Sequence, residues 1–221
     1  MSDVIQRDFL KIISQPILAY DEGLRFFRGV GLMNETLRRL ARDLDTHGIA
    51  YSVIGAVALN QHGYQRFTTD IDLLMTEEGL RKFTAELVGR GYRPAFTGAV
   101  KTFRSTAENV PIEIIISGEY PGDGKPKPVV FPEPSESSVE INGVSTISIE
   151  KLVELKLASG MTGIDRRKDL ADVQELIRAV GLGASFAERL DPSVRAAYVE
   201  LHDELVQARE QRLGPGREPG R

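Results

Sequence analysis

The chain has 221 residues, of which 41% are hydrophobic, and its formal net charge is -4. This length and apolar content allow a buried core in one domain, with room for a helical extension. The chain contains no cysteine, which excludes disulfides, thiolate metal sites and cysteine nucleophiles. No apolar stretch approaches the roughly 20 residues of a membrane helix, and the first residues lack the apolar region of a signal peptide. We therefore expect a cytoplasmic enzyme or binding protein.

The first part of the sequence predicts helices that lead into a strand. Apolar residues from Phe9 to Leu18 follow a helical period that breaks near Pro16, and we expect this N-terminal segment, residues 1–31, to pack on the core. The next helix is predicted to open at Asn34 and to stop at His47-Gly48. After it, the pattern predicts a strand over 51–54, a helix over 55–62, a strand over 71–75 and a helix over 77–89.

The pattern then changes to short strands, predicted over 94–97, 101–105, 111–116 and 139–141, the last turning at Asn142-Gly143. A proline- and glycine-rich loop, residues 117–138, interrupts them. Three further helices are predicted over 149–158, 166–180 and 192–211. We expect an α+β protein with a core over residues 32–148, a C-terminal helical part over 149–212 and a disordered tail over 213–221.

Asp70 and Asp72 carry the clearest chemical signal. Residues two apart in a strand point to the same face, so both carboxylates can reach one cation while Ile71 and Leu73 pack behind them. Aspartate is unfavourable in strands, and a divalent cation held by carboxylate oxygens would offset that cost. The alternative is a chance pair of aspartates on an exposed strand face.

Gly55-Ala56 and Glu113 become candidate site residues when they are considered together with this pair of aspartates. Gly55-Ala56 lies at a strand-to-helix turn, where glycine lets a phosphate approach the backbone, or simply turns the chain. Glu113 lies in the apolar run 111–116. It could be an edge-strand charge that prevents aggregation, or a third carboxylate that completes a two-metal site and accepts a proton.

The stretch from Tyr51 to Met75, with a glycine turn, a helix and then Asp-x-Asp, resembles the signature of the DNA polymerase beta-like nucleotidyltransferase superfamily. It is most similar to the small bacterial branch that includes abortive-infection and type IV toxin nucleotidyltransferases. The resemblance implies a mixed β-sheet flanked by helices. It also implies that Asp70, Asp72 and Glu113 bind magnesium, and that Gly55 and Ala56 hold the phosphates of a nucleoside triphosphate. Ala56 departs from the family, which often has Ser or a second Gly there.

The same resemblance places Arg66 near the phosphates and gives Lys156, with Asp169 and Asp172, a role at the nucleotide. From the residues alone, Arg66 could be an ordinary solvated loop residue, and Lys156 could extend its ammonium to solvent. Asp169 and Asp172 are one helical turn apart, so either could face a cleft, or both could belong to an exposed salt-bridged turn.

The implied function is magnesium-dependent transfer of a nucleoside monophosphate from an NTP to a hydroxyl acceptor. The acceptor could be a transfer RNA end, a protein or a small molecule, and the chain could be a toxin that pairs with an antitoxin protein. The alternative is a catalytically inactive protein of this fold that binds a nucleotide or a partner.

Overall fold

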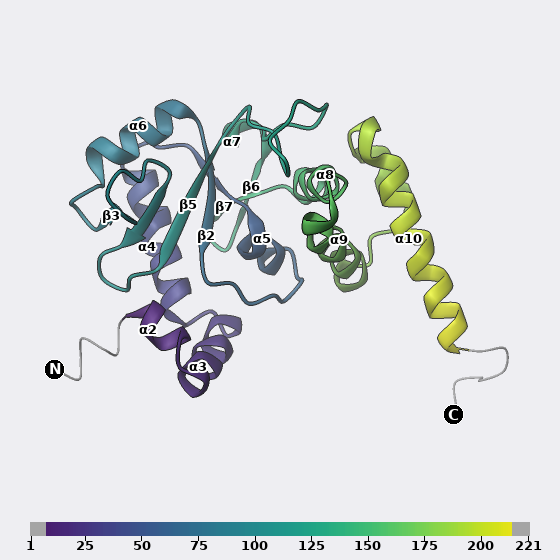
Figure 1. The fold of residues 1–221 in the computed structure, drawn as a ribbon, viewed down its shortest axis with the longest axis horizontal. Helices are drawn as coiled ribbons and strands as arrows, with labels where there is room; N and C mark the ends of the chain where they lie inside the picture. Colours follow the sequence, from purple (N-terminus) through teal and green to yellow (C-terminus); the bar gives the residue numbers. More distant parts are fainter. Residues whose placement is uncertain (1–7, 214–221) are drawn as a thin grey trace. The chain divides into compact units, whose positions relative to one another are not determined.

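The computed structural model describes residues 8–213 (Figure 1). The predicted tail beyond residue 213 lies outside the described residues. The chain divides into two compact units. Unit 1 comprises Met1–Glu119 and Phe131–Ser148, and unit 2 comprises Tyr120–Val130 and Ile149–Arg221. The chain therefore leaves unit 1 for a short segment, returns, and leaves again.

Unit 1 contains seven strands in one mixed sheet, in the order β3-β4-β5-β2-β1-β7-β6. The strands are β1 Tyr51–Val53, β2 Ile71–Met75, β3 Tyr92–Pro94, β4 Thr102–Ser105, β5 Pro111–Ile116, β6 Ser138–Ile141 and β7 Val144–Ile147. The β2–β5 and β1–β7 pairs are parallel, and the other pairs are antiparallel. Figure 1 shows β2 and β5 next to each other within this sheet.

The helices of unit 1 precede the strands or lie between them in the sequence. They are α2 Phe9–Ile13, α3 Pro16–Phe27, α4 Leu32–Thr46, α5 Gly55–Gln61, α6 Glu77–Glu86 and α7 Pro134–Ser137. The N-terminal helices belong to the same core, since the Phe9 side chain is buried and its N–H donates to the Glu108 carbonyl at 2.8 Å.

Alternation along the strands gives the sheet two different faces. Ile71, Leu73 and Met75 of β2 belong to one buried cluster with alternate residues of β5 and with apolar residues of α4 and α6. Asp72 of β2 points to the opposite face because successive side chains of a strand alternate. The hydrophobic pattern therefore fixes the register that brings the polar positions of β2 and β5 to one face.

Unit 2 is helical. Its elements are α8 Ile149–Gly160, the short 3₁₀ helix η1 Ile164–Arg166, α9 Arg167–Val180, η2 Ala184–Arg189 and α10 Pro192–Leu213. The α8 and α9 helices approach closely, because a Cβ at Gly160 would lie 2.5 Å from Leu170 Cδ2. None of the helices between residues 8 and 213 is long and apolar enough to cross a membrane.

The α+β class, with a mixed sheet flanked by helices and a helical C-terminal part, is confirmed. The strands predicted over 71–75 and 111–116 have the observed bounds. The strand predicted over 94–97 is wrong: β3 spans Tyr92–Pro94, where the buried Tyr92 ring contacts Phe83. The predicted loop 117–138 includes the short helix α7.

Candidate active site

Asp72 and Glu113 are neighbours across two strands. The parallel pairing of β2 and β5 sets Asp72 opposite Glu113, and adjacent strands lie about 4.8 Å apart. Both side chains therefore stand on the same face of the sheet. Because β5 lies between β4 and β2, the interpretation of Glu113 as an edge-strand charge is wrong. On its other side, Glu113 is paired in register with Thr102 of β4.

The Asp72 carboxylate lies directly over the turn that begins α5. Gly55, the first residue of this helix, has φ +64°, and a Cβ built there would lie 2.0 Å from Asp72 Oδ2. The backbone is tied at the same point, since Ile54 N–H donates to the Asp72 carbonyl at 3.0 Å. Ala56, the next residue, is buried. Only glycine leaves room for the carboxylate and adopts this left-handed conformation at low cost.

Asp70 lies in a bend one residue before β2, so only Asp72 of the pair is part of the strand ladder. Its orientation is set locally, because Thr68 Oγ1 donates to Asp70 Oδ1 at 2.6 Å. Both carboxylates are half-buried. The arrangement thus differs from the alternate strand positions expected from the sequence, and only Asp72 of the pair is shown against the Gly55 turn.

Asn60 fixes the loop that carries Arg66. Its Oδ1 accepts from Arg66 N–H at 3.0 Å, and its Nδ2 donates to the Arg66 carbonyl at 2.5 Å. The Arg66 side chain is half-buried rather than fully solvated. Sequence reasoning missed the roles of Asn60 and Thr102, because neither residue carries a local pattern: their importance comes from a loop contact and from strand register.

The donor set of this region suits a hard divalent cation, since Asp70, Asp72 and Glu113 offer only carboxylate oxygens. The absence of a side chain at Gly55 leaves the space that the Asp72 carboxylate occupies. Over the described part of the chain, however, no three His, Asp or Glu side chains are gathered closely enough to hold a metal. Glu113 is exposed, so its side chain has the freedom to turn toward a cation held by the aspartates.

In unit 2, the other predicted residues contact one another. Lys156 Nζ lies 3.0 Å from Asp169 Oδ1 and 2.7 Å from Asp172 Oδ2, and Ser159 Oγ donates to Asp169 Oδ2 at 2.7 Å. Burial alone would raise the pKa of Asp169, but the Lys156 ammonium and the hydrogen bond from Ser159 outweigh it and lower this pKa. Both aspartates thus face Lys156, and the exposed salt-bridged turn is wrong because all three side chains are buried.

The chain resembles several solved structures at low sequence identity. ANT(2'')-Ia in complex with adenylyl-2''-tobramycin is 17% identical over 75% of this chain and 94% of that chain, with a TM-score of 0.46. JHP933 from Helicobacter pylori is 15% identical over 82% of this chain and 94% of that chain, with a TM-score of 0.44. An antigenic nucleotidyltransferase-like protein from Paracoccidioides brasiliensis is 18% identical over 79% of this chain and 87% of that chain, with a TM-score of 0.46.

No family model matches the chain, and no curated protein matches it. The function proposed below therefore rests on the residues of this chain.

Proposed function

We propose that the protein is a magnesium-dependent nucleotidyltransferase that moves a nucleoside monophosphate from an NTP to a hydroxyl acceptor. The observation that carries this proposal is the packing of the Asp72 carboxylate on the Gly55 turn, where a Cβ would lie 2.0 Å from Asp72 Oδ2. A carboxylate beside a glycine turn can hold a cation and the phosphates that the cation neutralises. The register that sets Glu113 beside Asp72 adds a third carboxylate.

Each residue has a distinct role in this proposal. Asp70, Asp72 and Glu113 would hold magnesium, which would neutralise charge on the triphosphate and on the leaving pyrophosphate. Gly55 and Ala56, which the resemblance of residues 51–75 assigns to the triphosphate, begin α5 at the turn where the phosphate oxygens would bind. Arg66 supplies a planar guanidinium to the same oxygens.

The reaction needs a base and an aligned acceptor. The acceptor hydroxyl oxygen forms a bond to the α-phosphorus while the bond from the α-phosphorus to the bridging oxygen breaks. The hydroxyl proton passes to the Glu113 carboxylate, and pyrophosphate leaves. Glu113 is exposed, which gives an acceptor access to it. Thr68 keeps Asp70 oriented through the hydrogen bond to Asp70 Oδ1, which suits a reaction whose rate depends on positioning.

The proposal is tested by incubating the full chain with Mg²⁺, each labelled NTP and three acceptor pools: total RNA, protein extract and aminoglycosides. We expect the wild-type chain to transfer label to one of these pools. Asp72→Asn should abolish this transfer. The matched control is Asp45→Asn, an exposed aspartate at the end of α4, which should leave transfer unchanged. Label transfer that survives Asp72→Asn would contradict the mechanism.

A second candidate function is nucleotide binding without transfer. It is favoured by Ala56, which offers no hydroxyl to a phosphate where the resembled family often has Ser. In that case calorimetry would show Mg²⁺-dependent NTP binding that Asp72→Asn weakens, with no label transferred to any pool.

The toxin role is a finer proposal that rests on the resemblance of residues 51–75. It includes a cytoplasmic location and an antitoxin partner. Expression of the wild-type chain should arrest growth of a bacterial host, and Asp72→Asn should relieve the arrest. Equal growth with both chains at equal protein levels would contradict this role.

A further inference from the structure

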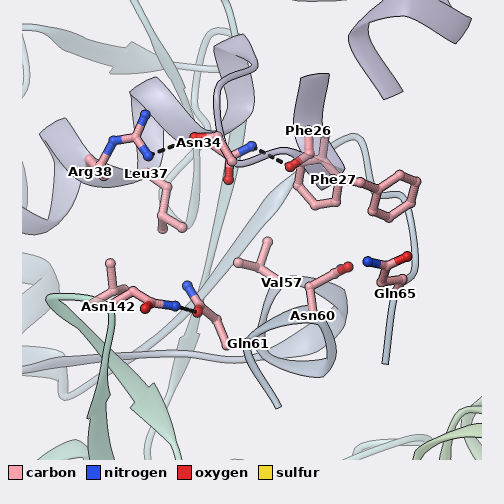
Figure 2. A pocket seen from close by; sticks show the side chains of 12 residues that line it. Phe26, Phe27, Asn34, Leu37, Arg38, Val57, Asn60, Gln61, Gln65 and Asn142 are labelled. Atoms are coloured by element: carbon pink, nitrogen blue, oxygen red, sulfur yellow. Dashed lines mark hydrogen bonds between the residues drawn. The ribbon is translucent and has the colours of Figure 1, made fainter. Parts of the chain in front are cut away.

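A cavity of about 280 Å³ lies within unit 1, and none of the carboxylates of the proposed site lines it. Figure 2 shows that side chains from α3, α4 and α5 surround it, together with Gln65 and the β6–β7 turn at Asn142. Its volume falls just below the roughly 300–1,000 Å³ of sites for drug-sized ligands. The cavity therefore suits a small ligand, at the lower end of that range.

The chemistry of the lining excludes some classes of ligand. None of the lining residues, all of them in the described part of the chain, is acidic, and the one charged side chain among them is Arg38. A polycation such as a polyamine would find no carboxylate and one like charge there. A ligand with an anionic group next to a neutral polar ring matches the lining better.

Amide side chains provide the polar groups. Asn142 Nδ2 donates to Gln61 Oε1 at 3.0 Å, which leaves Gln61 Nε2 as a donor and Asn142 Oδ1 as an acceptor. Asn34 uses its Nδ2 to donate to the Phe26 carbonyl at 2.9 Å, so its Oδ1 can accept a hydrogen bond. Donors and acceptors in this combination match the edge of a nucleobase, which presents both.

Phe27 and Arg38 match the face of the base and the phosphate of a nucleotide. The Phe27 ring is 41% exposed, although its neighbour Phe26 is buried and contacts it edge-on. An exposed aromatic ring beside amide groups is the surface on which unpaired bases stack. Arg38 Nη1 donates one hydrogen bond to the Gly29 carbonyl at 2.9 Å, and its other N–H groups can bind phosphate oxygens.

We propose that this cavity binds a nucleotide, with its base stacked on Phe27, its base edge on the amide side chains of the lining, and its phosphate on Arg38. The same chemistry could come from a free nucleotide or from an unpaired nucleotide of an RNA strand. The lining includes none of the proposed catalytic carboxylates, so the inference goes beyond the proposed function.

Binding is measured by calorimetry on the full chain in EDTA without added magnesium, with AMP, CMP, GMP, UMP and a single-stranded RNA pentamer. We expect at least one mononucleotide to bind. Phe27→Ala should weaken that binding at least about 5-fold, since stacking on an aromatic side chain contributes about 1 kcal/mol or more per base. The matched control is Phe96→Ala, which removes a ring that is 66% exposed but does not line the cavity.

The phosphate contact has its own matched pair on α4. Arg38→Gln should weaken binding of the nucleotide but not of the corresponding nucleoside. Arg42→Gln, at an exposed position one turn further along the helix, should change neither. Gln65→Ala, in an exposed loop, gives a second lining variant that leaves the helices intact. Tighter binding of the pentamer than of any mononucleotide would identify an RNA strand as the source, and equal or weaker binding a free nucleotide.

Three results would overturn the inference. The first is no binding of any nucleotide at millimolar concentration. The second is binding that Asp72→Asn abolishes while Phe27→Ala and Arg38→Gln leave it unchanged, which would place the nucleotide at the carboxylates. The third is equal binding of ribose 5-phosphate, which would show that no base is recognised.

Discussion

At the scale of single residues, the site depends on one glycine with two independent requirements. Gly55 has φ +64°, a conformation that side-chain-bearing residues rarely adopt, and it also faces the Asp72 carboxylate. Either requirement alone would favour glycine. Together they explain why an Asp can lie half-buried next to a helix start in this chain.

The substitution Gly55→Ala separates these two requirements when it is compared with Gly48→Ala. Gly48 has φ +59°, but a Cβ there would meet nothing within 4 Å. Both variants should lose about 1 kcal/mol or more of unfolding free energy because alanine is strained at positive φ. Only Gly55→Ala should also displace Asp72 and abolish nucleotide transfer. Thermal unfolding and the labelled-NTP assay measure the two effects, and equal transfer by both variants would contradict the assigned role.

Ser52 presents the opposite case, a buried polar group that gains nothing. Its Oγ is the one buried side-chain polar atom of the described residues that has no hydrogen-bond partner. Ser52→Ala should leave the unfolding free energy unchanged or raise it by up to about 1 kcal/mol, because an unsatisfied hydroxyl is removed. The matched control is Ser105→Ala, since Ser105 is equally buried but bonds to Glu108 and Val110. Denaturant unfolding should show a loss of about 1–3 kcal/mol for that control.

At the scale of elements, α8 and α9 are joined by charge as well as by packing. Lys156 of α8 contacts both Asp169 and Asp172 of α9. A buried ion pair adds little net stability when it is complete, but removing one partner leaves buried charge uncompensated. The nucleotide role of these three residues stays a prediction. A purely structural role would have a different consequence for the stability of the chain.

Lys156→Met distinguishes the two roles. A structural role predicts a loss of about 3–5 kcal/mol of unfolding free energy, because two buried carboxylates lose their cation. Lys168→Met, at an exposed position of α9, should change it by no more than about 0.5 kcal/mol. A nucleotide role predicts instead a raised KM for the NTP with unchanged stability. Chemical unfolding and steady-state kinetics on the same two variants decide between them.

The same cluster gives α8 and α9 a defined response to pH. Because the pKa of Asp169 is lowered in the folded chain, its charge stabilises the fold above its unfolded pKa of about 3.9, and this contribution is lost as pH falls through the folded pKa. The difference in unfolding free energy between the wild type and Asp169→Asn should therefore be largest near neutral pH and shrink below about pH 4. A difference that stays constant from pH 7 to pH 3 would show that the charge of Asp169 does not contribute.

The sequence predicted those elements whose signals are local. The Asn142-Gly143 turn was predictable because both residues adopt positive φ, 54° and 75°, as a tight hairpin requires. The strand over 71–75 was predictable too, because its residues are apolar except for Asp72 and polar residues bound it. Tyr92 was missed as a strand residue because its burial depends on Phe83, a contact that no local pattern records. Tertiary packing, rather than the local sequence pattern, therefore determines where this strand lies.

The candidate site was predictable only as a set of residues. Asp70, Asp72 and Gly55 lie close in sequence, and their types point to cation and phosphate chemistry. The pairing of Asp72 with Glu113 depends on the parallel register of β2 and β5, which joins positions about 40 residues apart in the chain. Likewise, the sequence named Lys156, Asp169 and Asp172 but did not predict that Lys156 contacts both aspartates, because a lysine in an apolar stripe more often extends to solvent.

At the scale of the whole molecule, the chain crosses between its two units more than once. Residues 120–130 belong to unit 2, although the segments on either side of them belong to unit 1. Within unit 2 this segment is held at Gly122, whose carbonyl accepts from Arg166 Nη2 at 3.3 Å. A Cβ at Gly122 would lie 2.7 Å from Thr162 Oγ1 and 3.0 Å from Ser159 Cα. The loop is therefore part of the helical unit's packing.

This packing predicts that Gly122→Val perturbs unit 2 more than unit 1. The matched control is Gly124→Val: Gly122 and Gly124 have similar positive φ, +79° and +70°, but a Cβ at Gly124 would meet nothing within 4 Å. Both variants carry the strain of valine at positive φ, so their difference isolates the contact with Ser159 and Thr162. Hydrogen exchange measured by mass spectrometry should be faster over 120–130 and the end of α8 in Gly122→Val than in Gly124→Val, with equal exchange over β2 and β5. Equal exchange over 120–130 in the two variants would mean that the loop is not anchored at Gly122, and faster exchange over β2 as well would mean that the two units lose stability together.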